Sequence, residues 1–240
     1  MWNKRRFCSA LLLPFLLVLP AGLRADDMPA PPPAPTGPAI LVLTSFDVPP
    51  AKISRAVALL KAYRAAATRT AGNRTALILQ QIDWRNRFLV YESWKDNAAY
   101  EANQRSAAAT RLCAGVLAIA NGNCDRRSYY QVALGPHRLP QGPGTVYMML
   151  HLDVFPSKLH PFFTSATRVA EMARKGRGNL FYDVASGVAV PWNYMAFVGA
   201  WRDRKAFEEY ETSDYARQFR TSVQDVLGSP FDDRLYTAIK

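Results

Sequence analysis

The apolar and polar positions between residues 40 and 134 follow the pattern of alternating strands and helices. Residues 40–47 alternate, with Ile40, Val42 and Phe46 on one face, which predicts a strand. Residues 51–70 place apolar side chains on one stripe and basic side chains off it, which predicts an amphipathic helix. The other predicted elements are strands over 75–82, 88–94 and 128–134 and a helix, capped by Asp96, over 96–118.

The same pattern returns in the second part of the chain. The segment Phe46-Asp47-Val48-Pro49-Pro50-Ala51-Lys52-Ile53 is repeated 106 residues later, and Trp94-Lys95-Asp96 is repeated 107 residues later as Trp201-Arg202-Asp203. The period is too long for a solenoid and fits a small domain duplicated in tandem. The predicted elements of this second copy lie at 146–153, 157–175, 180–185, 193–201, 203–227 and 234–239.

The order strand-helix-strand-strand-helix-strand is that of the ferredoxin-like βαββαβ unit. Such a sheet carries helices on one face only, so its other apolar face must be buried against a second sheet. We therefore expect an α+β fold in which two ferredoxin-like domains, 39–134 and 145–240, joined by a linker at 135–144, pack sheet to sheet as a pseudo-dimer within one chain. The space between the sheets is then the expected ligand cavity. Further association into a higher oligomer stays open.

The first residues have the layout of a secretory signal peptide. A basic start at residues 4–6 precedes an apolar run over residues 7–19, and small residues precede a cleavage site after residue 25. The apolar run is shorter than the ~20 residues that a membrane span needs, and no later segment qualifies. Residues 26–38 are rich in Pro and Ala, which predicts an extended spacer. We expect an exported protein, periplasmic or secreted, with residues 1–25 removed and no membrane span after this cleavage. An uncleaved anchor is the alternative.

The formal net charge of the chain is +11. The predicted signal peptide holds four basic residues and no acidic one, which leaves +7 for the rest of the chain. An exported protein does not meet nucleic acid routinely, and no Lys/Arg cluster is interleaved with aromatic residues. We therefore do not expect nucleic-acid binding, and we assign the charge to solubility and weak attraction to an anionic surface.

Two cysteines follow the predicted signal peptide, Cys113 and Cys124. Disulfides persist in the oxidising compartments outside the cytoplasm, so we predict one structural disulfide between them. Two free, buried thiols are the alternative. No His or further Cys stands at metal-ligand spacing, so no metal site is expected.

The segments Val48-Pro49-Pro50-Ala51-Lys52, Thr68-Arg69-Thr70-Ala71-Gly72-Asn73 and Val90-Tyr91-Glu92-Ser93-Trp94-Lys95-Asp96 resemble the antibiotic biosynthesis monooxygenase domain. The resemblance covers about residues 40–134 and, more loosely, 146–239. It implies a ferredoxin-like fold that pairs into a dimeric α+β barrel, in a family that includes cofactor-free quinol monooxygenases and haem-degrading enzymes.

The chain also departs from this family at positions that matter for chemistry. Many members carry a His nine residues after the motif Trp, where this chain has Asn103 and, in the second copy, Tyr210. Glu92 of the first motif becomes Gly199 in the second. Haem-degrading members use an Asn on the first strand, where this chain has Thr44 and Leu150.

Six residues are our candidates for a site in the expected cavity. The catalytic candidates are His151, Asn103 and Tyr210, and the substrate-binding candidates are Trp94, Trp201 and Tyr91. Each also has a structural reading. The tryptophans could pack the core between sheet and helix, Asn103 and Tyr210 could face solvent or cap a helix, and His151 could be a hydrogen-bonded structural residue.

Three functions follow from these candidates. The first is oxidation of a small aromatic molecule, such as a quinol, without metal, flavin or other cofactor. The second is a non-catalytic binding module of the same fold. The third is haem binding through His151 or His160. His160 is a candidate because the related chlorite dismutase-like proteins hold haem through a helix His in the second of two ferredoxin-like halves.

Overall fold

The structure is a computed structural model that describes residues 39–122, 124–133, 142–187 and 193–240. The predicted signal peptide, the spacer at 26–38 and residues 135–141 of the predicted linker lie outside these residues. We call residues 39–133 the N-half and residues 142–240 the C-half.

The N-half contains the predicted elements in the predicted order. They are β1 (Ile40–Asp47), η2 (Pro50–Lys52), α1 (Ile53–Ala67), β2 (Asn73–Gln81), β3 (Arg87–Trp94), α2 (Asn97–Gln104), α3 (Ala107–Leu117) and β4 (Asp125–Ala133). The C-half repeats this order with β5 (Val146–Asp153), η3 (Pro156–Lys158), α4 (Leu159–Lys175), β6 (Asn179–Gly187), β7 (Tyr194–Trp201), α5 (Arg204–Glu211), α6 (Asp214–Val223), η4 (Gln224–Val226) and β8 (Asp232–Ala238).

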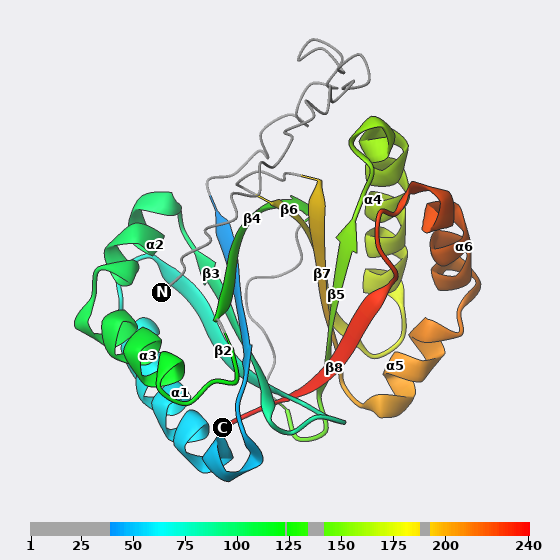
Figure 1. Ribbon diagram of the computed structural model, residues 1–240. Helices are drawn as coiled ribbons and strands as arrows, with labels where there is room; N and C mark the ends of the chain where they lie inside the picture. Colours follow the sequence, from blue (N-terminus) through cyan, green and yellow to red (C-terminus); the bar gives the residue numbers. More distant parts are fainter. Residues whose placement is uncertain (1–38, 123, 134–141, 188–192) are drawn as a thin grey trace, which may run out of the picture.

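In the described residues the strands form one closed barrel in the order β1-β3-β2-β8-β5-β7-β6-β4. The last strand of each half joins the two halves, because β4 pairs with both β1 and β6, and β8 pairs with both β5 and β2. The helices of the N-half and of the C-half cover opposite sides of the barrel (Figure 1). The predicted pseudo-dimeric α+β barrel is confirmed, and hydrogen-bonded strand pairs seal both of its seams.

The alternation of side chains along each strand separates two kinds of core. One set of positions, with Leu43, Leu89 and Tyr147 among them, meets inside the barrel in a cluster shared by both halves. The neighbouring positions face outward and pack under the helices of their own half. Successive strand residues point to opposite faces, so every strand contributes to both cores.

The predicted helices over 96–118 and 203–227 are each broken in two, which corrects the expectation of one helix. Ser106 and Ser213 adopt extended backbone at the breaks. Their hydroxyl oxygens accept hydrogen bonds from the N–H groups of Ala109, at 3.1 Å, and Ala216, at 3.3 Å. A serine in this conformation begins a new helix as its N-cap. The N-cap predicted at Asp96 is confirmed, since its carboxylate accepts from the N–H of Ala99 at 2.8 Å.

Candidate functional site

The barrel interior is filled by side chains and is not the cavity expected between the sheets. Its buried positions include Leu41, Leu79, Tyr129 and Phe181. An eight-stranded barrel is just wide enough for its own side chains to fill. The groups that concern function therefore lie between the outer face of the strands and the helices of each half.

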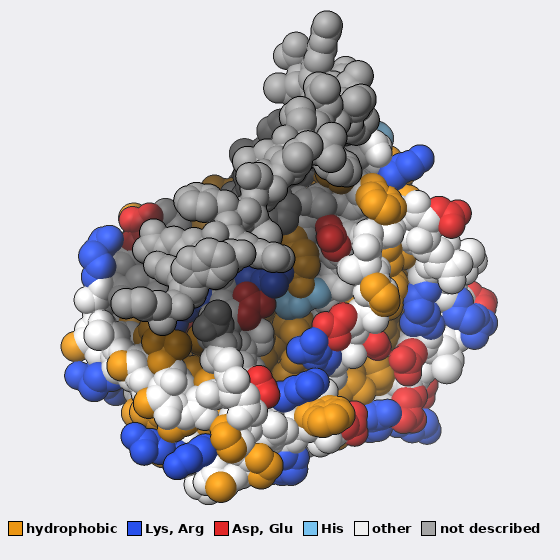
Figure 2. Space-filling view, in the orientation of Figure 1, with side chains coloured by type: hydrophobic (Ala, Val, Ile, Leu, Met, Phe, Trp, Pro, Cys, Tyr) orange, Lys and Arg blue, Asp and Glu red, His pale blue; other side chains and the backbone are white. Residues whose placement is uncertain are grey.

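His151 is one of the predicted site residues that point into the barrel, near one of its ends. Its Nε2 lies 3.2 Å from the Tyr129 hydroxyl, and its ring lies 5.1 Å from the Tyr194 ring. Burial, and next the charge of Arg127, lowers the pKa of His151 to about 4. Acidic, basic and histidine side chains gather near the middle of this face of the molecule (Figure 2). With so low a pKa, His151 is a weak base at neutral pH.

Tyr91 also faces the barrel interior. Its hydroxyl donates to Asp183 Oδ2 at 3.1 Å, which ties β3 of the N-half to β6 of the C-half. Burial, followed by the charge of Asp183, raises the pKa of Tyr91 well above its usual range. The predicted substrate-binding residue is thus part of the contact between the halves.

The space under the helices of the N-half holds a buried polar centre. The Tyr63 hydroxyl, on α1, donates to Glu92 Oε1, on β3, at 2.7 Å. Asn103 Nδ2, on α2, donates to the Tyr63 oxygen at 2.8 Å. Glu92 and Asn103 are each 1% exposed. We call Tyr63, Glu92 and Asn103 the Glu92 centre.

The environment of Glu92 suits a proton acceptor near neutral pH. Burial raises its pKa from about 4.5 to about 7, although the hydrogen bond from Tyr63 and the charge of Arg126 act in the opposite direction. A catalytic base is most effective when its pKa lies near the working pH. Burial also raises the pKa of Tyr63 well above its usual range, so Tyr63 remains a hydrogen-bond donor.

Two amide atoms near the Glu92 centre lack partners within the described residues, Asn103 Oδ1 and Gln104 Nε2. The Trp94 side chain faces Glu92 and lowers the pKa of that carboxyl by hydrogen bonding. Arg126 closes one side of the space, with its guanidinium donating to Gln104 Oε1 and, at 3.3 Å, to Thr44 Oγ1. Buried polar groups are normally paired, so this cluster of unpaired atoms indicates where a small polar ligand or water would bind.

The C-half places aromatic side chains where the N-half has its polar centre. Strand pairing aligns Gly199 opposite Tyr182 and Met148, as Glu92 stands opposite Ala76 and Val42. The hydroxyls of Tyr182 and Tyr210 share a hydrogen bond at 2.9 Å. Burial raises the pKa of Tyr210 to about 12. Neither tyrosine can serve as a base at neutral pH.

A cavity of about 240 Å³ lies in the C-half between the sheet and its last two helices. Tyr210, a predicted catalytic residue, is in its wall, while Trp201 packs behind Tyr210 with ring centroids 4.7 Å apart. The lining residues are Met148, Leu150, Phe207, Tyr210, Glu211, Ala216, Phe219, Arg220, Phe231 and Asp233.

The six predicted site residues therefore fall into three places and not one. Trp94 and Asn103 lie together in the N-half, Trp201 and Tyr210 lie together in the C-half, and His151 and Tyr91 face the barrel interior. The sequence reading did not select Glu92 as a functional residue. Its signal was present, because a carboxylate interrupts the apolar face formed by Phe88, Val90 and Trp94, and buried carboxylates are rare.

Cys113, on α3, and Cys124, just before β4, are free thiols in the structure and do not form the predicted disulfide. Burial is the main cause that raises the pKa of Cys124, and Cys113 contributes further through its charge. A thiol with a raised pKa has little thiolate at neutral pH and is slow to oxidise.

The residues proposed for haem do not fit that group. His160 is exposed at the start of α4 and does not line the cavity of the C-half. His151 faces the barrel interior, where its Nε2 is already engaged by Tyr129. Within the described ranges, no three His, Cys, Asp or Glu side chains are grouped as a metal site. In the same ranges, no helix has the length and apolar character of a membrane span.

The fold and the two helix-covered spaces define a dimeric α+β barrel completed by one chain. Residues 39–114 match the antibiotic biosynthesis monooxygenase family, so the resemblance predicted from the motifs is confirmed for the N-half.

Solved structures share the whole barrel. A candidate monooxygenase of Fusobacterium nucleatum subsp. nucleatum aligns with a TM-score of 0.77 at 15% identity, over 85% of this chain and 94% of its own. An anthrone oxidase-like protein aligns with a TM-score of 0.69 at 13% identity, over 85% of this chain and 93% of its own. A candidate chlorite dismutase aligns with a TM-score of 0.61 at 9% identity, over 85% of this chain and 96% of its own. At these identities the likeness shows the fold alone. No curated protein sequence matches the chain.

Proposed function

We propose that the N-half is a monooxygenase site that oxidises a small phenol or quinol with dioxygen and without a bound cofactor, with Glu92 as the base. The observation that carries the proposal is the buried Glu92 carboxyl, with a pKa of about 7, held by Tyr63 and beside the unpaired Asn103 Oδ1. The family matched by residues 39–114 supports the reaction class.

In the proposed reaction, the ionised Glu92 carboxylate takes the proton of the substrate hydroxyl. The resulting phenolate gives one electron to dioxygen, which forms superoxide and a phenoxyl radical. The two combine in a new C–O bond at a ring CH carbon ortho or para to the phenol oxygen, and the proton held by Glu92 passes to the peroxide. The O–O bond then breaks as this carbon loses its hydrogen, and water leaves. One oxygen atom of dioxygen enters the product and the other leaves as water, so a ring C–H becomes C=O and the phenol becomes a quinone.

The neighbouring side chains position the base and the substrate. Asn103 Nδ2 and the Tyr63 hydroxyl form a chain of hydrogen bonds that ends on Glu92 and fixes its carboxyl group. Asn103 Oδ1 is free to orient the substrate hydroxyl, and the Trp94 side chain stabilises the ionised form of Glu92 by hydrogen bonding to its carboxylate. The apolar surroundings exclude water from the radical pair.

The test is oxygen uptake with a panel of quinols by wild type and Glu92→Gln. Loss of a general base slows such a reaction by about 10²–10⁴-fold. The wild-type rate should rise with pH through about 7, as Glu92 loses its proton, and this limb should vanish in the variant. Glu101→Gln, at an exposed position of α2, is the matched control and should keep full activity. Equal rates in wild type and Glu92→Gln would refute the proposal.

A non-catalytic binding role is the second candidate, and the absence of a carboxylate at Gly199 favours it for the C-half. A ligand that raises the melting temperature but is never consumed by either half would support this role for the whole protein.

We also propose that the protein acts after export, with residues 1–25 removed. The basic start, the apolar run and the small residues before residue 26 support this proposal. Intact-mass measurement of protein from the periplasm or the medium should give an N-terminus near Asp26. A mass that retains residues 1–25 would contradict it.

A further inference from the structure

The cavity of the C-half has the size and the walls of a binding site for a small aromatic ring. Pockets for drug-sized ligands span about 300–1,000 Å³, so a cavity of about 240 Å³ suits one or two rings. Phe207, Tyr210, Phe219 and Phe231 supply aromatic walls, and Met148 and Leu150 of β5 supply an apolar floor. Aromatic walls bind flat rings through stacked and edge-to-face contacts.

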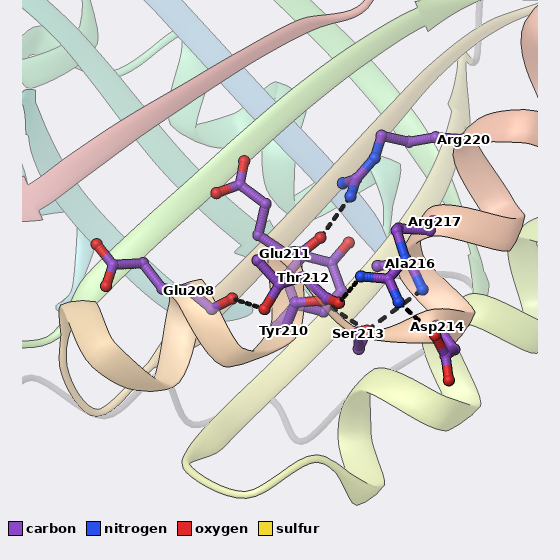
Figure 3. Close-up of polar contacts among 9 residues, drawn as sticks. All are labelled: Glu208, Tyr210, Glu211, Thr212, Ser213, Asp214, Ala216, Arg217 and Arg220. Atoms are coloured by element: carbon purple, nitrogen blue, oxygen red, sulfur yellow. Dashed lines mark hydrogen bonds and ion pairs between the residues drawn. The ribbon is translucent and has the colours of Figure 1, made fainter.

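The charged groups of this cavity are Glu211 at the end of α5, Arg220 of α6 and Asp233 of β8. Figure 3 shows Arg220 of α6 directed at the backbone oxygen of Glu211, to which its guanidinium donates. Within the described residues, no carboxylate lies within ion-pair distance of Arg220. The remaining guanidinium N–H groups are therefore available to a ligand oxygen.

The charges at this end favour a neutral phenol over an aromatic acid. The Glu211 and Asp233 carboxylates also line the cavity and would repel a second carboxylate. A phenol satisfies both kinds of group, because its oxygen accepts from Arg220 while its O–H donates to a carboxylate. A plain hydrocarbon would leave Arg220 unused.

The C-half cannot hold the base that the N-half has. A Cβ atom at Gly199 would lie 2.6 Å from Cη2 of Trp201 and 3.1 Å from Cδ2 of Tyr182. Real Cβ atoms essentially never show contacts below 3.0 Å, so a carboxylate side chain at this position would require the Trp201 ring to shift. The carboxylates that remain lie at the rim, where Asp233 is exposed.

From these observations we infer that the C-half cavity is a second binding site, for a one- or two-ring phenol, that holds its ligand without reacting with it. The site is separate from the Glu92 centre, because it lies under the helices of the other half, on the opposite side of the barrel (Figure 1). Binding can be measured without turnover, so the inference does not depend on the proposed oxidation.

Calorimetric titration with 1-naphthol tests the site. Ala216→Leu fills the cavity from α6 and should weaken binding at least tenfold. Arg220→Gln removes the guanidinium donor and should weaken 1-naphthol about tenfold while leaving naphthalene unchanged. Ala109→Leu, at the equivalent position of α3, is the matched control and should leave binding in the C-half cavity as in wild type.

The outcomes separate the two proposals. Unchanged 1-naphthol affinity in Ala216→Leu and Arg220→Gln, or loss of all 1-naphthol binding in Ala109→Leu, would overturn the second site. If Ala216→Leu does not fold, Leu150→Phe fills the cavity from β5, and Arg220→Gln at the rim decides independently. Oxygen uptake should be normal in Arg220→Gln, and absence of uptake in wild type would refute only the oxidation in the N-half.

Discussion

The two halves of the barrel share a backbone plan but fill the same space with opposite chemistry. In the N-half a tyrosine of the first helix and an asparagine of the second hold a buried carboxyl group. In the C-half two tyrosines bond to each other and a tryptophan packs against them. The equivalent positions are Tyr63 and Val169, Ala76 and Tyr182, Glu92 and Gly199, and Asn103 and Tyr210.

The difference is an exchange of volume between neighbouring strands. Where the N-half has a small residue beside a large one, Ala76 beside Glu92, the C-half has the reverse, Tyr182 beside Gly199. Since interiors are close-packed, the Tyr182 ring and the Trp201 indole take up the space that a carboxylate would need. The exchange removes the titratable group and increases aromatic packing, and it distinguishes the half that we propose reacts from the half that we propose only binds.

The largest effect on the free energy of unfolding is expected from substitution of the two repeated tryptophans, Trp94 and Trp201. Trp201 has ring contacts with Tyr182, Phe207 and Tyr210, at 6.0, 5.2 and 4.7 Å between centroids. Trp94 has one described ring contact, with Tyr100 at 6.5 Å. Trp201→Ala should lower the free energy of unfolding by about 3–5 kcal/mol, and Trp94→Ala by roughly 1–2 kcal/mol less. Urea unfolding measures both, and equal losses would mean that the aromatic packing of the C-half adds no stability.

The buried carboxyl group predicts a pH dependence that only the N-half can cause. The folded pKa of Glu92, about 7, lies above its ordinary value of 4.5. Between these values the unfolded chain has lost the proton and the folded chain still holds it, so stability falls as pH rises and levels off above 7. The shift corresponds to on the order of 3 kcal/mol. The measurement is the free energy of unfolding from pH 4 to 8.

Other groups also titrate in this range, so the comparison with Glu92→Gln isolates the effect. The free energy of unfolding of Glu92→Gln should increase relative to that of wild type as pH rises from 4.5 to 7, because only wild type loses stability through Glu92. A difference that is constant with pH would show that Glu92 titrates normally and is not suited to act as a base.

The fold could be predicted from the sequence because its signals are local and repeated. The alternation of apolar and polar residues predicted the strands, and the repeated segments predicted the two halves. Each predicted sheet has an apolar face without helices, so the two sheets were expected to pack against each other. The breaks at Ser106 and Ser213 were missed because the apolar stripe continues across them, and only the hydroxyl of each serine marks the second helix start.

The site was harder to predict, because alternation shows which residues share a face but not which face meets the helices. Tyr91 and Trp94 are three positions apart on one strand and so point to opposite faces. That spacing alone excludes one cavity lined by both. Asn103 was selected as a replacement for a family His, and its hydrogen-bond partner, Tyr63, lies 40 residues away in sequence. Tyr63 in turn donates to Glu92.

A smaller effect tests whether the C-half lacks room at Gly199. Gly199→Ala places a Cβ atom 2.6 Å from the Trp201 ring, and overpacking of this kind costs about 1–3 kcal/mol. Gly122→Ala is the control, because nothing lies within 4 Å of its Cβ position, and it should change stability by less than about 0.5 kcal/mol. If Gly199→Ala is neutral, the C-half could accommodate a side chain there, and the steric argument against a base in that half fails.

The smallest effect concerns the helix breaks, which the two halves share in spite of their different interiors. Ser106→Ala and Ser213→Ala each remove an N-cap and should cost about 1 kcal/mol. Ser222→Ala, which caps no helix start, should stay within about 0.5 kcal/mol. The two turns lie in separate halves, so the double variant should show the sum of the single losses. The turn at Ser213 also receives donors from Arg217 and Arg220 (Figure 3). If Ser213→Ala alone is neutral, these arginines hold the turn, and the rim of the C-half cavity is fixed by the same guanidinium that we propose meets its ligand.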